Sequence, residues 1–193
     1  MSSKLIVGLG NPGKEYHKTR HNVGEDFIDI AARKYKVVMK KENKFSSYHA
    51  SFIKYDKKVH LIKPDYYMNE SGIAVSKIID YLDIDIQNTL VIHDELDLPF
   101  GEIKFKESGG HGGHNGLRNI IDHLNGNSSF KRLRIGIGHP GKDKDVTRYV
   151  LGRTSEKERE LLEINMENCL NSLDLFIEDK WQKAMLNLHT KKD

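Results

Sequence analysis

Two side chains of this sequence have the types needed for general-base chemistry. His21 follows a glycine-rich turn, and Asp94 closes the apolar segment 89–94. A histidine with an unperturbed pKa of about 6.5 can accept a proton near neutral pH, and a carboxylate can fix its tautomer and stabilise the imidazolium. The sequence has no serine or cysteine in a G-x-S-x-G nucleophile elbow, so water is the expected nucleophile. The alternative is that His21 only caps a helix or lies exposed.

The turn before His21 carries a third candidate, Asn11. The segment GLGNPG (8–13) matches G-x-G-x-x-G, which after a strand is typical of dinucleotide-binding proteins. That motif requires a helix to begin within the glycines, but residues 14–20 are polar apart from Tyr16, and helical periodicity starts only beyond them. The segment VVM (37–39) is also followed by basic residues and not by a ribose-binding acid. We therefore expect a turn that positions Asn11 and His21, and no nicotinamide cofactor.

A second glycine-rich segment, SGGHGGHNG (108–116), precedes a predicted helix. The backbone N–H groups of such a loop suit phosphate or other polar backbone contacts. His111 and His114 are three residues apart, but no cysteine lies nearby and no third ligand has a useful spacing, so no zinc site is expected. Asn115 could cap the following helix or offer its amide inward. The alternative is a plain mobile surface loop.

Basic residues flank this glycine loop on two predicted strands. Strand alternation places Lys104 and Lys106 on one face, and Arg132 and Arg134 likewise share a face. Such cations beside a glycine loop could follow a phosphate backbone, although a solvated sheet edge is the alternative. The net charge of +3 permits a nucleic-acid partner without indicating one.

The elements that must position these residues alternate between strands and helices. This order predicts an α/β fold, a single-domain three-layer sandwich over residues 1–193 with a mixed, mostly parallel twisted sheet flanked by helices. Asn22 and Glu25 have the spacing of a capping box at the start of the first helix. The expected strands are 4–7, 47–56 and 58–63 as a hairpin around Asp56-Lys57, 89–94, 102–107 and 132–138. The expected helices are 22–36, one from about Ser71, 117–124 and 162–177.

Composition describes an ordinary globular protein. The chain has 193 residues, of which 37% are apolar and 31% charged. No apolar run approaches the roughly 18 residues of a membrane span, and the N-terminus lacks a signal-peptide pattern. The single cysteine, Cys169, excludes an internal disulfide and falls on the apolar stripe of a predicted helix. We expect a cytoplasmic protein without a membrane partner.

Six segments occur in a fixed order between residues 4 and 141: KLIVGLGNPGKEY, TRHNVG, KPDYYMNESG, HDELDLPFG, KFKESGGHGGHNGL and RLRIGIGHPG. Together with VLGR at 150–153, they resemble the bacterial peptidyl-tRNA hydrolases. The resemblance implies hydrolysis of the ester that joins a peptide to the 3′ end of tRNA, by a monomer without cofactor or metal. His21 would be the base, Asp94 would hold it, and Asn11 would lie at the scissile group.

The same resemblance implies a set of binding residues. Asn69 and Asn115 would hold the substrate through their amides. Lys106 and Arg134 would contact tRNA phosphates, whereas the loop 142–145 gives no single assignable contact. An RNA-binding module without catalysis is the main alternative, and the presence of both His21 and Asp94 favours the enzyme. The remaining residues that the resemblance places at the cleft are Tyr16, Tyr67 (commonly phenylalanine in the family), Met68 and His114.

Overall fold

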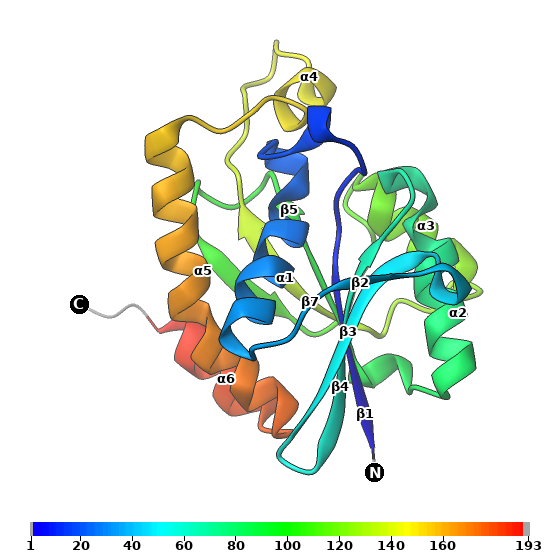
Figure 1. The fold of residues 1–193 in the computed structure, drawn as a ribbon. Coiled ribbons are helices and arrows are strands. Elements are labelled where there is room, and N and C mark those ends of the chain that lie inside the picture. The colour runs from blue at the N-terminus through cyan, green and yellow to red at the C-terminus, as the bar shows by residue number, and fades with distance from the viewer. Residues whose placement is uncertain (1, 191–193) are drawn as a thin grey trace.

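One twisted β-sheet runs through the protein in the computed structural model, which describes residues 2–190 (Figure 1). Its strands are β1 (Ser3–Gly8), β2 (Lys40–Glu42), β3 (Ser47–Lys54), β4 (Lys57–Pro64), β5 (Thr89–Glu95), β6 (Ile103–Lys106) and β7 (Lys131–Gly136). Within this part of the chain they hydrogen-bond in the order β2-β3-β4-β1-β5-β7-β6. The four consecutive strands β4, β1, β5 and β7 are parallel, whereas β2, β3 and β6 pair antiparallel at the two edges.

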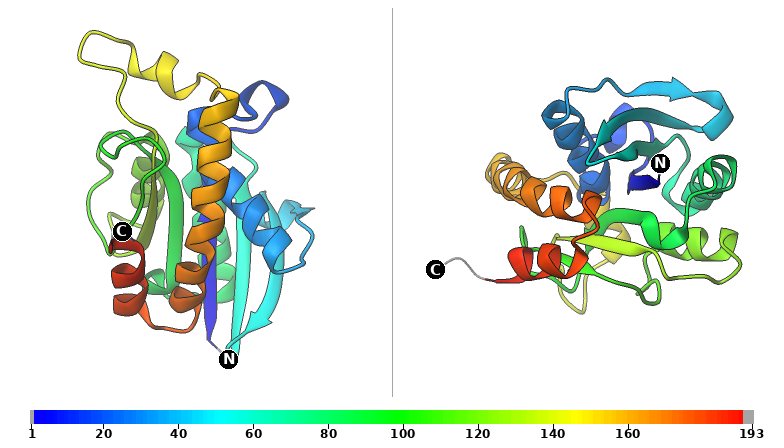
Figure 2. Two further views of the ribbon diagram at one scale, coloured as in Figure 1. Left: turned by 90° about the vertical axis from the view of Figure 1, so that its left-hand side faces the viewer. Right: turned by 90° about the horizontal axis from the view of Figure 1, so that it is seen from below.

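Helices cover both faces of this sheet, as expected for a three-layer sandwich (Figure 2). The helices are α1 (Val23–Lys34), α2 (Ser71–Leu82), α3 (Asn115–His123), α4 (Val146–Val150), α5 (Glu156–Ile177) and α6 (Trp181–His189). One apolar core lies between the sheet and α1, α5 and α6, and a second lies between the sheet and α2 and α3. α4 lies beyond the carboxyl ends of the parallel strands, at the top of Figure 1. No helix within the described range is long and apolar enough to cross a membrane.

The central strands form because their sequences are apolar on both faces. In β1 and β5, Leu5 to Val7 and Leu90 to Ile92 are fully buried, as required for strands covered by helices on both sides. Leu5 pairs with Thr89 and Gly8, the last residue of β1, with Ile92, so β5 continues past the end of β1 to Glu95. This register brings the turn after β1 and the end of β5 to the same edge of the sheet.

The predicted elements are present, but three others were missed. β2 is a short polar edge strand, α4 is a single turn and a half, and α6 follows α5 after a short turn, so none carries a strong periodic pattern. The hairpin turn lies one residue earlier than predicted, at Tyr55 and Asp56, which both have positive φ. Cys169 is buried in the core as expected.

The predicted capping box at the start of α1 is wrong. Asn22 makes no side-chain cap of α1, because its amide is committed to the backbone of Asn11 in the preceding turn. A true capping box occurs instead at α5, where Ser155 and Glu158 bond to each other's backbone N–H groups. The two residues of the box are three apart in both places. At α1 the contact of Asn22 with Asn11 prevents the cap from forming.

The first turn of α1 packs directly against the backbone of β1 and β5. At Gly24, an added Cβ would lie 2.3 Å from the carbonyl oxygen of Ile92 and 2.6 Å from the amide nitrogen of Leu9. These are backbone atoms of the sheet, so they cannot yield as the end of a side chain would. Only glycine therefore allows α1 to approach closely enough to hold the preceding residues over the sheet edge.

We predict that Gly24→Ala destabilises the protein although alanine favours helices. The propensity gain is about 1 kcal/mol, whereas overpacking against rigid backbone costs about 1–3 kcal/mol. Urea unfolding should therefore show a lower free energy of unfolding for Gly24→Ala. Asn168→Ala on the exposed face of α5 is the control and should unfold like the wild type or slightly later. A Gly24→Ala protein as stable as the wild type would contradict the close packing.

Candidate active site

A cleft with a volume of about 710 Å³ opens at the carboxyl edge of the sheet. Its walls come from the turn after β1, the segment before α2, the end of β5, the glycine loop before α3, and α4. The structure therefore brings together segments that are far apart in the sequence. The predicted site residues that line the cleft are Asn11, His21, Tyr67, Met68, Asn69, Asp94, Lys106, His114, Asn115 and Arg134.

Tyr16 is the predicted residue that does not line the cleft. It lies behind Tyr67, with the two ring centroids 6.2 Å apart and the rings edge to face. Tyr67 itself is 51% exposed at the rim of the cleft. Tyr16 therefore packs against Tyr67, and of the two rings Tyr67 is the one that lines the cleft.

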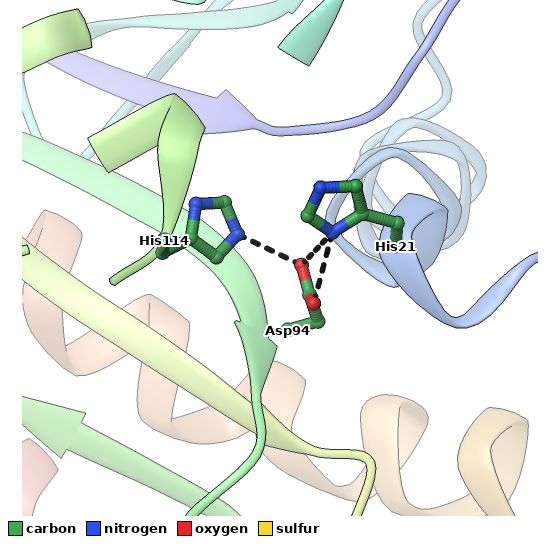
Figure 3. Close-up of side chains that lie close together, drawn as sticks. All are labelled: His21, Asp94 and His114. Carbon is green, nitrogen blue, oxygen red and sulfur yellow. Dashed lines mark hydrogen bonds and ion pairs between the residues drawn. The ribbon is translucent and has the colours of Figure 1, made fainter. Parts of the chain in front are cut away.

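His21 and Asp94 form a close pair (Figure 3). The Nδ1 atom of His21 is 2.9 Å from both carboxylate oxygens of Asp94. His21 lies in a short 3-10 turn just before α1, and Asp94 lies near the end of β5, so the β1–β5 register creates the pair. A proton on Nδ1 that is donated to the carboxylate leaves the Nε2 lone pair of His21 available as a base.

Asp94 also accepts a hydrogen bond from a second histidine, His114. The Nε2 atom of His114 is 2.8 Å from Oδ1 of Asp94. At the other side of this ring, Nδ1 accepts the backbone N–H of Leu117 in the first turn of α3. Because Nδ1 is an acceptor, the proton of a neutral His114 must lie on Nε2 and point at Asp94.

These contacts correct the expectation that His114 has no third metal ligand within reach. Ligand atoms of His21, Asp94 and His114 lie within 4.8 Å of one another, a grouping that could hold a metal ion. However, the Nε2 atom that would bind a metal is the atom on which the Leu117 contact places the proton of His114. The donor set therefore fits two N–H groups that share one carboxylate better than it fits a cation.

The electrostatics of the pair follow from burial and charge together. Burial alone would raise the pKa of Asp94, but the two histidines beside it hold that pKa well below the usual range. Burial alone would lower the pKa of His21, but the charge and hydrogen bond of Asp94 outweigh it, so the pKa of His21 is raised above 6.5. Asp94 is thus a carboxylate over the whole physiological range, and His21 is a stronger base than a free histidine.

Asn11 is oriented by a network that the sequence did not reveal. Its side-chain oxygen accepts the backbone N–H of Met68 at 2.7 Å, so its NH₂ group is the part that remains to face the cleft. The side chain of Asn22 clamps the backbone of Asn11, accepting its N–H and donating to its carbonyl, both at 2.9 Å. Asn22 thus holds Asn11 in place, a contact that its spacing from Glu25 did not indicate.

Asn69 and Asn115 contribute two further amides to the cleft. Asn69 lies in the 3-10 turn Met68–Glu70, and Asn115 is the first residue of α3. Both side chains are exposed, and both line the cleft. Asn115 does not cap α3, because the N-cap residue is His114, so a bound molecule can reach both amides.

The predicted group of four cations is divided by the structure. The prediction of a phosphate-facing Arg132 is wrong, because this side chain is only 2% exposed and donates to the carbonyls of Gly109 and Gly110 in the glycine loop. Lys104 pairs with Glu102 at 2.6 Å and does not line the cleft. Lys106, Arg132 and Arg134 all line the cleft. Because the Arg132 guanidinium is bonded to the loop, Lys106 and Arg134 are the cleft cations left to meet an anion, and Arg134 lies 3.8 Å from Glu95.

Comparisons with known proteins identify relatives of this chain. A model of the family described as "Peptidyl-tRNA hydrolase" matches residues 5–193. The chain is 46% identical to a peptidyl-tRNA hydrolase of Pseudomonas syringae pv. tomato, covering 98% of this chain and 97% of the relative. It is 48% identical to one of Coxiella burnetii, covering 97% of both chains.

A solved structure gives the same answer for the fold. The crystal structure of peptidyl-tRNA hydrolase from Acinetobacter baumannii superposes with a TM-score of 0.92 at 40% identity, covering 98% of this chain and 95% of that one. Sequence, fold and family model therefore agree over nearly the whole chain, and the chain belongs to the peptidyl-tRNA hydrolase family.

Proposed function

We propose that this protein hydrolyses the ester between a peptide and the 3′ end of tRNA, with His21 as the general base for water. The observation that carries the proposal is the hydrogen bond from Nδ1 of His21 to the buried carboxylate of Asp94. It leaves Nε2 of the same ring as the proton acceptor within the cleft. The membership of the chain in the peptidyl-tRNA hydrolase family supplies the substrate.

The proposed reaction begins with a water molecule between Nε2 of His21 and the ester carbonyl carbon. Nε2 takes one proton from this water while its oxygen attacks the carbonyl carbon, giving a tetrahedral oxyanion. The Asp94 carboxylate stabilises the imidazolium that forms. The bond to the 3′ oxygen of the tRNA then breaks, and the proton on Nε2 passes to that oxygen. A free peptide carboxyl group and a tRNA with a 3′ hydroxyl result.

The amide of Asn11 is the best-oriented donor for the oxyanion. Its oxygen is held by Met68, so its NH₂ group can donate to a group in the cleft. A preorganised donor of this kind contributes about 2.7–4 kcal/mol in other enzymes. We assign Asn69 and Asn115 to the peptide backbone, because exposed amides can hold a main chain without reading its side chains. Tyr67 and Met68 provide the apolar contacts beside them.

The tRNA part is proposed to be held through its phosphates by Lys106 and Arg134. Contacts to phosphate are independent of base sequence, which suits an enzyme that must accept many tRNAs. The mechanism uses one chain and requires neither a cofactor nor a metal ion. We therefore propose a monomeric, metal-independent enzyme of the cytoplasm, where translation supplies its substrate.

We expect the purified protein to cleave N-acetyl-aminoacyl-tRNA in the presence of EDTA. The comparison is free aminoacyl-tRNA, which should be cleaved much more slowly because its ester lacks the amide that the cleft asparagines would hold. Release of tRNA is followed on acid gels. Binding of tRNA without cleavage of the blocked ester would instead favour an RNA-binding module. Loss of turnover in EDTA that Zn²⁺ restores would contradict metal independence.

The pH dependence should report His21. A base acts in its neutral form, so kcat/KM should rise as the pH passes upward through the pKa of His21. Because that pKa is raised, the midpoint of this acid limb should lie above pH 6.5. His21→Ala should lower kcat by about 10²–10⁴-fold and remove this limb. Asp94→Asn should also lower kcat, because it no longer fixes the tautomer. An unchanged acid limb in His21→Ala would refute the assigned base.

Removal of the cleft cations should weaken tRNA binding in a salt-dependent way. For Lys106→Ala and Arg134→Ala, the slope of log K against log salt should fall by about one each. kcat should change much less than KM, because the phosphates lie away from the scissile bond. Lys104→Ala is the matched control on the strand of Lys106, since Lys104 does not line the cleft. An equal effect of Lys104→Ala would show that only general surface charge matters.

A further inference from the structure

One carboxylate serves two imidazoles in this cleft. Oδ1 of Asp94 is 2.9 Å from Nδ1 of His21 and 2.8 Å from Nε2 of His114, and the two rings are 5.1 Å apart (Figure 3). The side chain of Asp94 is only 3% exposed, so water cannot replace either donor easily. A change in one hydrogen bond to Asp94 therefore alters the strength of the other.

The helix α3 fixes which proton His114 offers. His114 is the N-cap residue of α3, and its Nδ1 accepts the N–H of Leu117 at 3.3 Å. The first N–H groups of a helix have no partner within the helix, so this contact is the cap that the helix requires. A neutral His114 then carries its proton on Nε2, directed at Asp94. The ring connects the start of α3 to the base through the carboxylate.

We propose that His114 is a positioning residue that acts through Asp94 to set the basicity of His21. This inference rests on the proposed function, in which His21 is the base. It assigns to His114 a role other than contact with the substrate. The hydrogen bond from the Leu117 N–H contributes to this role, because it keeps the proton of His114 on Nε2, where it is donated to Asp94.

The physical reason is competition for one negative charge. A donor N–H from His114 stabilises the Asp94 carboxylate and so weakens its hold on the proton of the His21 imidazolium. Without that donor, Asp94 attracts the His21 proton more strongly, and the pKa of His21 rises further. The base would then be protonated over more of the physiological range, and less of the enzyme would be ready to react.

The other charged and titratable groups around the cluster do not take over this role. On the His21 side, Arg20 is committed to Glu158 at 3.1 Å. His93 packs 5.0 Å from the His114 ring and is neutral, because burial lowers its pKa to about 3. The other charged side chains and histidines that line the cleft are His93, Glu95, Asp97, Lys106, His111, Arg132, Arg134 and His139, and no hydrogen bond joins the side chain of any of them to the Asp94 carboxylate within the described residues.

Two substitutions separate the cap from the donor. In His114→Asn, the side-chain oxygen can still accept the Leu117 N–H, but no N–H reaches Asp94. In His114→Gln, an N–H can reach Asp94, but the cap is lost. If His114 serves only the fold, Asn should resemble the wild type and Gln should be the damaged variant. If our proposal holds, His114→Asn is instead the variant in which the pKa of His21 changes, and His114→Gln keeps the wild-type pKa.

The measurement is the pKa of His21 by NMR of the imidazole nitrogens in the full chain, without substrate. We expect His114→Asn to raise this pKa by about one unit, and His114→Gln to leave it at the wild-type value. Thermal unfolding of both variants checks the fold, and Asn should unfold closer to the wild type. The same pKa in all three proteins, or a shift confined to Gln, would overturn the proposal.

The acid limb of kcat/KM gives the matching functional readout. The midpoint of this limb should lie at a higher pH in His114→Asn and at the wild-type pH in His114→Gln, whatever happens to KM. If the wild type fails to hydrolyse peptidyl-tRNA, the proposed function falls, while the NMR titration still decides whether His114 controls His21. If the wild type is active and the NMR pKa does not move, only the role of His114 is overturned.

Discussion

The buried charge of Asp94 is the constraint on which the site depends. A carboxylate at 3% exposure would be protonated or would destabilise the fold unless donors compensated for its lost hydration. Two imidazoles supply those donors, one from the turn before α1 and one from the start of α3. The carboxylate therefore joins β5 to elements that lie on opposite faces of the sheet. The position of the base is set by the same contacts that make the burial of Asp94 tolerable.

Neighbouring residues in the turn before α1 make different contacts. His21 turns into the cleft, while Asn22 turns back and holds the backbone of Asn11. Gly24 then lets the helix approach the sheet closely enough for both contacts to form. A single shift of this turn would displace the base and the amide of Asn11 together. The two groups that would act on one carbonyl, His21 through water on its carbon and Asn11 on its oxygen, are thus held in a fixed relation by the segment from His21 to Gly24.

The sequence allowed much of this to be predicted, and the failures have a common cause. The buried strands and the His21–Asp94 pair were accessible because apolar runs define β1 and β5 and because parallel neighbours end at one edge. The contacts of Asn22 and Arg132, and the contact of His114 with Asp94, could not be predicted from the sequence. Each of these side chains has a partner distant in sequence, which local spacing does not reveal. The spacing suggested a helix cap for Asn22, a phosphate contact for Arg132, and for His114 a pair with His111 that lacks a third ligand.

Arg132 shows what such a long-range partner can do. Its guanidinium lies beneath the glycine loop, stacks on Phe130 and binds two loop carbonyls near one end, while His114 anchors the other end on Asp94. Between these anchors, a Cβ added at Gly112 or Gly113 would meet no atom within 4 Å. The loop is thus held at both ends, with His111 as the side chain between them. At Gly112 and Gly113 the wall of the cleft is main chain alone, so at these two positions a bound molecule meets backbone and no side chain.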